Sequence, residues 1–163
     1  MTTARRTSRA MLVLVTTGFV VSGLAGLAFQ VLWGRYLGLF VGGSAEAHTL
    51  VLATFMGGLA LGNAIFGRIV DRIENRLYLY ALLEAGVGLF CFFFPEIFGA
   101  LGALWTQVAR STAGTPSLHG PLKAALAAVC LLPPTILMGG TLPALARAVT
   151  DRGVTFIGPP PEA

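Results

Sequence analysis

Long apolar segments, separated by short polar or charged breaks, dominate the chain. Residues 50–66 contain no charged side chain, and residues 77–95 contain a single one, Glu84. Two further apolar segments cover residues 10–41 and about 122–148. Because a membrane-spanning helix needs roughly 20 mostly apolar residues, the pattern predicts four spans, at about 11–41, 44–66, 77–95 and 122–148.

The length and prolines of these segments predict irregular helices. The first segment would be about 48 Å long as one helix, against a hydrocarbon core of about 30 Å, so we expect it to tilt strongly or to break. Pro95 is expected to close or kink the third span. Pro133, Pro134 and Pro143 predict a kinked fourth helix buried among the others, because lipid cannot satisfy the backbone groups that proline frees.

The composition favours a membrane protein. Hydrophobic residues make up 55% of the chain and charged residues 11%, whereas about a quarter of the residues in an ordinary soluble domain are charged. The 21 glycines are scattered through the apolar segments, and Gly58 and Gly62 form a Gly-x-x-x-Gly pair of the kind used in close helix packing. We therefore expect an all-α fold: a polytopic transmembrane helical bundle of about four spans.

Basic residues are concentrated on one side of this bundle. Residues 1–9, the charged segment 67–76 and the C-terminal flank hold eight arginines, and the other side holds Arg110, Lys123 and, on one assignment, Arg35. The eight are Arg5, Arg6, Arg9, Arg68, Arg72, Arg76, Arg147 and Arg152. The positive-inside rule then places both termini in the cytoplasm (N-in/C-in). Residues 1–9 become a cytoplasmic N-terminus, 10–149 a multi-pass bundle in the inner (cytoplasmic) membrane, and 150–163 a disordered cytoplasmic tail.

The sequence lacks the motifs of soluble enzymes and of nucleic-acid binding. The net charge is +4, but the basic residues lie beside span ends and form no stripe with interleaved aromatics. No phosphate-binding loop, nucleophile elbow or zinc-type cysteine pair is present. His48 and His119 are the only histidines, so no metal site and no cofactor are expected. The expected partners are the lipid bilayer and either further copies of the chain or another membrane subunit.

Glu84 is the sharpest candidate for chemistry, because it lies in the middle of an apolar segment. A carboxyl group there costs several kcal/mol by insertion scales unless it is protonated, paired or turned toward a polar cavity. One reading is a binding site for a proton or another cation. The other is a structural hydrogen bond between helices, with Gln30, Asn63 or Arg35 as the partner.

Gln30 and Arg35 complete the candidate intramembrane polar site. They lie five residues apart on the first predicted span and could line an entrance with two candidates from the outer side, Glu46 and His48. The alternative reading is interfacial anchoring, with Arg35 snorkelling to the membrane surface.

The charged segment 67–76 resembles the loop signature of major facilitator transporters, Gly-x-x-x-Asp-Arg. Gly67, Asp71 and Arg72 match it, whereas Glu74 and Asn75 stand where that family prefers Gly and Arg. With Arg76 these matching residues form a loop charge cluster. The resemblance implies charge pairs that lock neighbouring helix ends together.

A broader resemblance covers residues 22–149. The segments SGLAGLAFQVLWGR (22–35), FMGGLALG (55–62), LYALLE (79–84) and LPPTILMGGTLP (132–143) are similar, in order, to motifs of the membrane-bound spermidine synthase-like (polyamine aminopropyltransferase) family. That resemblance implies an N-terminal membrane bundle joined to a cytoplasmic Rossmann-like domain, which transfers an aminopropyl group to a diamine. The catalytic domain and the later membrane helices are absent here, and the sequence after Asp151 departs from the family pattern. We therefore expect a truncated relative without activity of its own.

Three functions remain open from the sequence. The first is the membrane domain of a spermidine synthase-like protein, which anchors the enzyme and handles a polyamine or related cation. The second is a transporter-like half-bundle that works as an oligomer, with Glu84 as its cation site. The third is a non-catalytic accessory subunit of a larger membrane complex.

Overall fold

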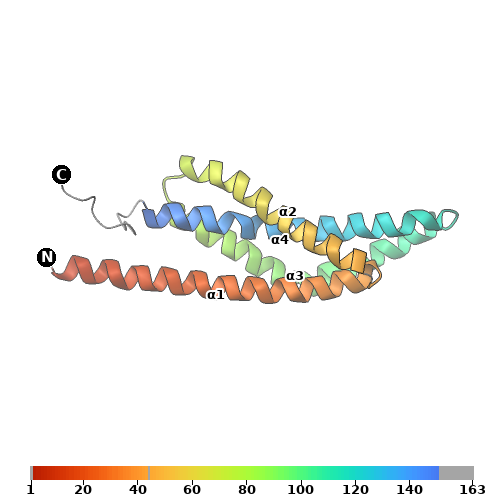
Figure 1. Ribbon diagram of the computed structural model, residues 1–163, viewed down its shortest axis with the longest axis horizontal. Coiled ribbons are helices and arrows are strands. Elements are labelled where there is room, and N and C mark those ends of the chain that lie inside the picture. Colours follow the sequence, from red (N-terminus) through yellow and green to blue (C-terminus); the bar gives the residue numbers. More distant parts are fainter. Residues whose placement is uncertain (1, 44, 151–163) are drawn as a thin grey trace.

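Four long helices account for nearly all of the described chain. The computed structural model describes residues 2–43 and 45–150, without the side chains of residues 2–12, 14, 15, 46, 47 and 116. The helices are α1 (Thr2–Val41), α2 (Ala45–Ile69), α3 (Arg76–Ser111) and α4 (His119–Thr150), and short 3-10 turns at Val70–Arg72 and Pro116–Leu118 precede α3 and α4 (Figure 1). No strand occurs in residues 2–43 and 45–150. The prediction of an all-α bundle of four helices is confirmed.

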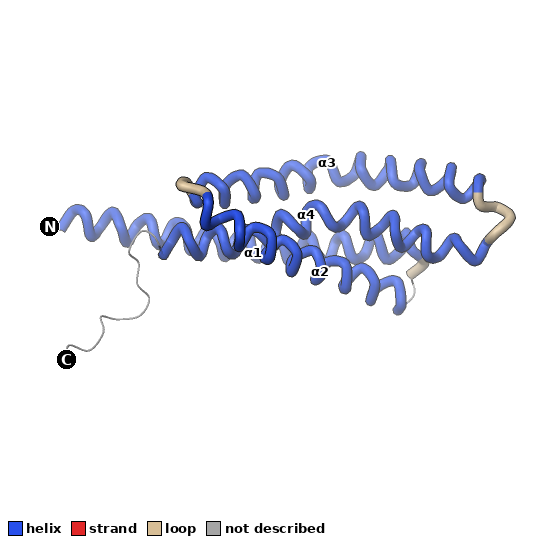
Figure 2. The backbone as a smooth tube through the Cα atoms, turned by 90° about the horizontal axis from the view of Figure 1, so that it is seen from above, coloured by secondary structure: helices blue, strands red, loops and turns tan. Residues whose placement is uncertain are grey.

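The helices run alternately up and down the bundle. The start of α1, the α2–α3 connection and the end of α4 lie at one end, and the other two connections lie toward the opposite end (Figures 1 and 2). The α3–α4 hairpin extends beyond the α1–α2 turn at that opposite end. Of the predicted disordered tail, only Thr150 falls within the described residues, and it ends α4.

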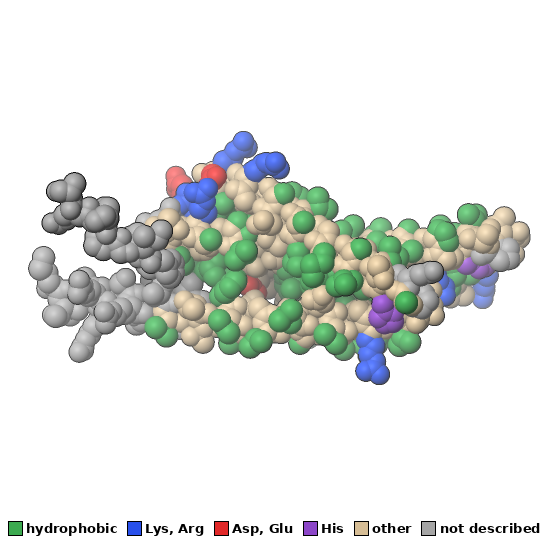
Figure 3. Space-filling view, viewed as in Figure 1, with side chains coloured by type: hydrophobic (Ala, Val, Ile, Leu, Met, Phe, Trp, Pro, Cys, Tyr) green, Lys and Arg blue, Asp and Glu red, His purple; other side chains and the backbone are tan. Residues whose placement is uncertain are grey.

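Each helix is long and apolar enough to cross a membrane. The qualifying segments are Thr16–Val41, His48–Arg72, Arg76–Ser111 and His119–Thr150. Large apolar side chains such as Val31 and Phe92 remain more than 70% exposed, as expected of helices that face lipid rather than water. Figure 3 shows apolar side chains along the bundle and charged ones gathered toward its ends. The fold is that of a multi-pass membrane protein.

The structure decides between the alternatives left open for the first and third helices. The first helix does not break: α1 is continuous over 40 residues, about 60 Å at 1.5 Å per residue. The third helix does not end at Pro95, which lies inside α3, and residues 96–111 extend it to Ser111. Proline removes one backbone donor and crowds the preceding turn but need not end a long helix. Accordingly α3 changes direction near its middle in Figure 1 while staying helical.

Glycines bring α2 and α4 into backbone contact. A Cβ atom on Gly62 would lie 3.0 Å from the Cα of Gly139, and one on Gly139 would lie 2.8 Å from the Cα of Leu59. A Cβ atom on Gly58 would likewise be too close to a neighbour, here the side chain of Thr135. This confirms the packing role predicted for Gly58 and Gly62. It also explains how α4, with three internal prolines, becomes the most buried of the four helices.

Aromatic rings, rather than glycines, join α1 to α3. Trp33 is fully buried and its ring contacts Phe29, Phe90 and Phe94 at centroid distances of 5.6 to 5.9 Å. The pattern continues toward the α3–α4 end through four further rings, those of Tyr36, Phe40, Phe98 and Trp105. We call this set of eight residues the aromatic seam. Large rings bridge helices at a distance, so α1 is held by side chains instead of by close backbone approach.

Candidate functional site

Glu84 faces the interior of the bundle from the first half of α3. The hydroxyl group of Ser22 on α1 donates a hydrogen bond to Oε1 of Glu84 at 2.6 Å. Neighbouring positions on the same helix, Leu83 and Val87, are buried, and the Glu84 side chain is itself partly buried. The partner of Glu84 is thus a residue 62 positions earlier and not Gln30, Asn63 or Arg35, which the sequence suggested.

A pocket of about 360 Å³ opens beside the Glu84 carboxyl group. Its polar lining consists of Glu84, Ser22 of α1 and Thr141 of α4, and Thr141 already donates to the carbonyl oxygen of Met138 at 2.8 Å. The rest of the wall is apolar or glycine: Phe19, Gly23, Ala25, Gly26, Phe29, Leu59, Val87, Gly88, Met138 and Leu142. The phenol of Tyr80, one turn before Glu84 on α3, interacts electrostatically with the same carboxyl group. We call the lining residues Ser22, Glu84 and Thr141, together with Tyr80 beside Glu84, the carboxylate pocket.

Sequence reasoning missed three members of this pocket. Tyr80 lies four residues before Glu84, and that spacing puts both on one face of a helix, so the sequence did contain a signal for it. Ser22 and Thr141 lie on other helices, and only the packing of α1 and α4 against α3 brings them near Glu84.

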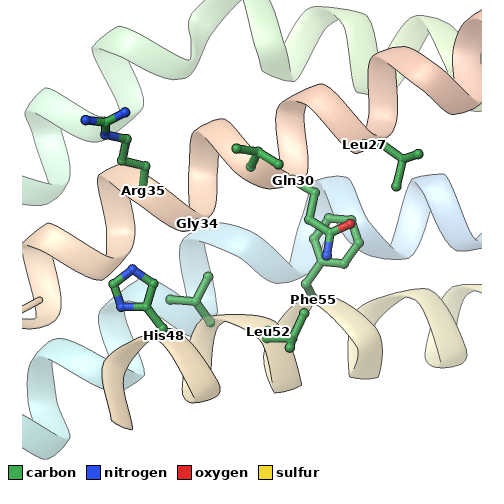
Figure 4. A pocket seen from close by; sticks show the side chains of 9 residues that line it. Leu27, Gln30, Gly34, Arg35, His48, Leu52 and Phe55 are labelled. Carbon is green, nitrogen blue, oxygen red and sulfur yellow. The ribbon is translucent and has the colours of Figure 1, made fainter. Parts of the chain in front are cut away.

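Gln30 and Arg35 belong to a different pocket from Glu84. This second pocket lies between α1 and α2, has a volume of about 530 Å³ and includes His48 in its wall (Figure 4). The structure thus places Gln30, Arg35 and His48 in the wall of one pocket and Glu84 in the wall of another. Glu46 lies in the first turn of α2, and its side chain is outside the described residues.

The loop charge cluster occupies the end of the bundle where α2 meets α3. Asp71 forms an ion pair with Arg147 of α4, with Nη2 and Oδ1 3.1 Å apart. Nε of Arg76 donates to the carbonyl oxygen of Val70 at 3.2 Å. Asn75 caps α3, because its side-chain oxygen accepts from the backbone N–H of Tyr78 at 3.1 Å.

One of these contacts is a charge pair between helix ends. A carboxylate from the loop joins the ends of two helices, α2 and α4. Gly67, by contrast, has nothing within 4 Å of where a Cβ would stand, so no close contact in the bundle requires glycine there. Arg72 is exposed at the same end.

Comparisons with protein-family models, with curated proteins and with solved structures found no match for this chain.

Proposed function

We propose that this chain is a membrane module akin to the N-terminal bundle of spermidine synthase-like proteins. In this proposal it anchors an aminopropyltransferase or a related enzyme in the membrane and is not catalytic by itself. The same module binds a polyamine or another organic cation in the carboxylate pocket. The resemblance of the four sequence motifs supports the family assignment, and the carboxylate pocket supports the cation.

Glu84 beside an open pocket is the observation that carries the proposal. A carboxylate in an apolar bundle is costly unless a partner balances its charge. The hydroxyl group of Ser22 donates a hydrogen bond to Glu84, but neither it nor the hydroxyl group of Thr141 carries a charge. A primary or secondary ammonium group would supply both the charge and the donors, and the volume of about 360 Å³ is in the usual range for small-molecule sites. The methylene chain of such a ligand matches the apolar wall.

The charged end supports the N-in/C-in orientation in an inner (cytoplasmic) membrane. Arg68, Arg72, Arg76 and Arg147 belong to the end of the bundle where α2 and α4 finish. Arg110 and Lys123 flank the α3–α4 turn at the other end. By the positive-inside rule, this excess of basic residues at one end of the bundle indicates that the α2–α3 connection is cytoplasmic.

Binding of radiolabelled spermidine to the purified protein in lipid nanodiscs tests the cation site. Glu84→Gln should abolish saturable binding, because it keeps the shape and the acceptor for Ser22 but removes the charge. Glu96→Gln is the matched control: it removes an exposed carboxylate from the same helix, outside the pocket. Equal binding by wild type and Glu84→Gln would overturn the proposal.

A transporter-like half-bundle working as an oligomer is the second candidate. The Asp71–Arg147 ion pair favours it, since the loop motif of major facilitator transporters implies charge pairs of this kind. Uptake of spermidine by proteoliposomes separates the two functions: saturable binding without uptake supports the anchoring module, and uptake that depends on Glu84 supports the transporter. Copurification of a stoichiometric membrane partner would instead favour an accessory subunit.

A further inference from the structure

The pocket between α1 and α2 plays no part in the cation binding proposed at Glu84. Three residues supply its polar lining, Gln30, Arg35 and His48, and none of the nine lining residues is acidic. The rest is apolar or glycine: Leu27, Val31, Gly34, Val51, Leu52 and Phe55. A guanidinium group stays charged at any physiological pH and, together with N–H donors, matches phosphate or carboxylate oxygens. The polar chemistry of this pocket therefore suits an anion and disfavours a cation.

Two of the three polar lining residues lie near the α1–α2 turn, whereas Gln30 lies deeper on α1. Arg35 lies within the last two turns of α1 and His48 within the first turn of α2, both close to the α1–α2 turn. Leu27 and Phe55 lie about two turns deeper on their helices. The pocket thus has a polar rim near the end of two spans and an apolar wall that runs into the membrane.

The pocket opens sideways, toward lipid. Leu27, Val31 and Leu52 are at least 50% exposed although they line it. In Figure 4 the side chains of Gln30 and Phe55 lie beside one another between α1 and α2, whereas Arg35 extends away from α2. Arg35 is thus at the outer edge of the pocket that it lines.

Gly34 keeps the middle of this pocket open. A Cβ atom on Gly34 would meet nothing within 4 Å, whereas one turn later a Cβ on Gly38 would lie 3.1 Å from the imidazole of His48. The imidazole thus closes the groove against α1 at Gly38, and the space beside Gly34 stays free.

We propose that this pocket binds an anionic phospholipid. One acyl chain lies along the apolar wall beside Gly34, and the phosphate group binds at the rim to the guanidinium group of Arg35. The charge complementarity at the rim selects an anionic headgroup, and the lateral opening makes a bilayer lipid, rather than free phosphate, the occupant. This inference concerns a different pocket from Glu84 and stands whether or not spermidine binds there.

Native mass spectrometry of the protein released from nanodiscs with equal amounts of phosphatidylglycerol and phosphatidylcholine tests the inference. We expect the wild type to retain phosphatidylglycerol preferentially. Arg35→Gln should lower this preference about fivefold, the factor that one basic side chain near a membrane surface typically contributes. Gly34→Leu should reduce retention of both lipids, because its side chain fills the space beside the acyl chain.

Two control variants match these substitutions. Gly18→Leu places the same side chain at another position of α1 where a Cβ meets nothing within 4 Å and which lines neither pocket. Arg110→Gln removes an exposed arginine outside both pockets. Both should retain lipid as the wild type does. Unchanged retention in Arg35→Gln and Gly34→Leu would overturn the inference, as would an equal loss of preference in Arg110→Gln or full competition by inorganic phosphate.

Discussion

Gly62 of α2 lies directly against Gly139 of α4, so closely that a Cβ atom on Gly62 would come within 3.0 Å of the Gly139 Cα. The contact is between two backbones, and neither can give way as a flexible side chain would. This position fixes how near the two helices stand. It is the point at which the bundle is least tolerant of added volume.

Gly62→Ala should destabilise the protein. Overpacking of this kind typically costs about 1–3 kcal/mol, which outweighs the gain of up to about 1 kcal/mol that Ala brings to a helix. We expect a lower melting temperature in detergent, followed by the loss of helical circular dichroism.

Gly57→Ala is the control for this variant on the same helix, since a Cβ there would meet nothing within 4 Å. It should melt at or slightly above the wild-type temperature. Similar melting of Gly62→Ala and Gly57→Ala would show that the α2–α4 contact is looser than the structure has it.

The hydrogen bond between Ser22 and Glu84 should couple α1 to α3. A double-mutant cycle of Ser22→Ala and Glu84→Ala isolates this pair, and we expect a coupling of about 0.6 kcal/mol, the average for hydrogen bonds between membrane helices, and at most about 1.7 kcal/mol. Unfolding in mixed micelles with increasing denaturing detergent measures it. Strictly additive single and double variants would mean that the two side chains do not stabilise one another.

Substitutions of Trp33 by Phe and by Ala should differ widely in their effect on stability, because of its indole nitrogen. It is buried without a hydrogen-bond partner in the described part of the chain, and such a donor costs about 1–3 kcal/mol. Trp33→Phe removes this donor, which offsets the packing it loses, so stability should stay within about 1 kcal/mol of wild type. Trp33→Ala should cost about 3–5 kcal/mol, because it empties the centre of the aromatic seam.

The Trp33 prediction is checked by thermal unfolding of both variants in the same detergent. Trp105→Phe is a useful companion, because it leaves Trp33 as the only tryptophan. The remaining fluorescence should then resist quenching by acrylamide, since Trp33 is fully buried. Easy quenching would contradict the burial on which the prediction depends.

The ion pair between Asp71 and Arg147 should contribute little to stability. The two side chains are 50% and 54% exposed, and exposed pairs are typically worth about 0.2–1 kcal/mol. Asp71→Asn and Arg147→Gln should each shift the melting temperature only slightly, and less still in high salt. A large loss in either variant would indicate that the pair holds the charged end together more strongly than its exposure implies.

Much of this fold could be predicted from the sequence. The number of helices and the all-α fold follow from the lengths of the apolar segments. The spacing of Gly58 and Gly62 alone predicts a close contact between helices. The continuation of α3 past Pro95 could not be predicted in this way. Residues 96–111 are short and only partly apolar as a separate segment, and their helicity depends on being attached to the helix before them.

Only part of the carboxylate pocket could be predicted from the sequence. Glu84 stands out because a charged side chain is costly in an apolar segment. Its partner Ser22 could not be identified from the sequence, because it is one of several small polar residues in the apolar segments and no pattern around it distinguishes it. The separation of Glu84 from Gln30 and Arg35 follows from how α1 rotates against its neighbours, a property of packing rather than of pattern.

The aromatic seam also sets an order of events during synthesis. Trp33 belongs to α1, which is made before α3, and Phe90 and Phe94, whose rings contact it, come about sixty residues later. Until α3 has entered the membrane, the indole of Trp33 lacks the rings of Phe90 and Phe94. The contacts that join α1 to α3 can therefore form only after α3 has been inserted, later than those between α1 and α2.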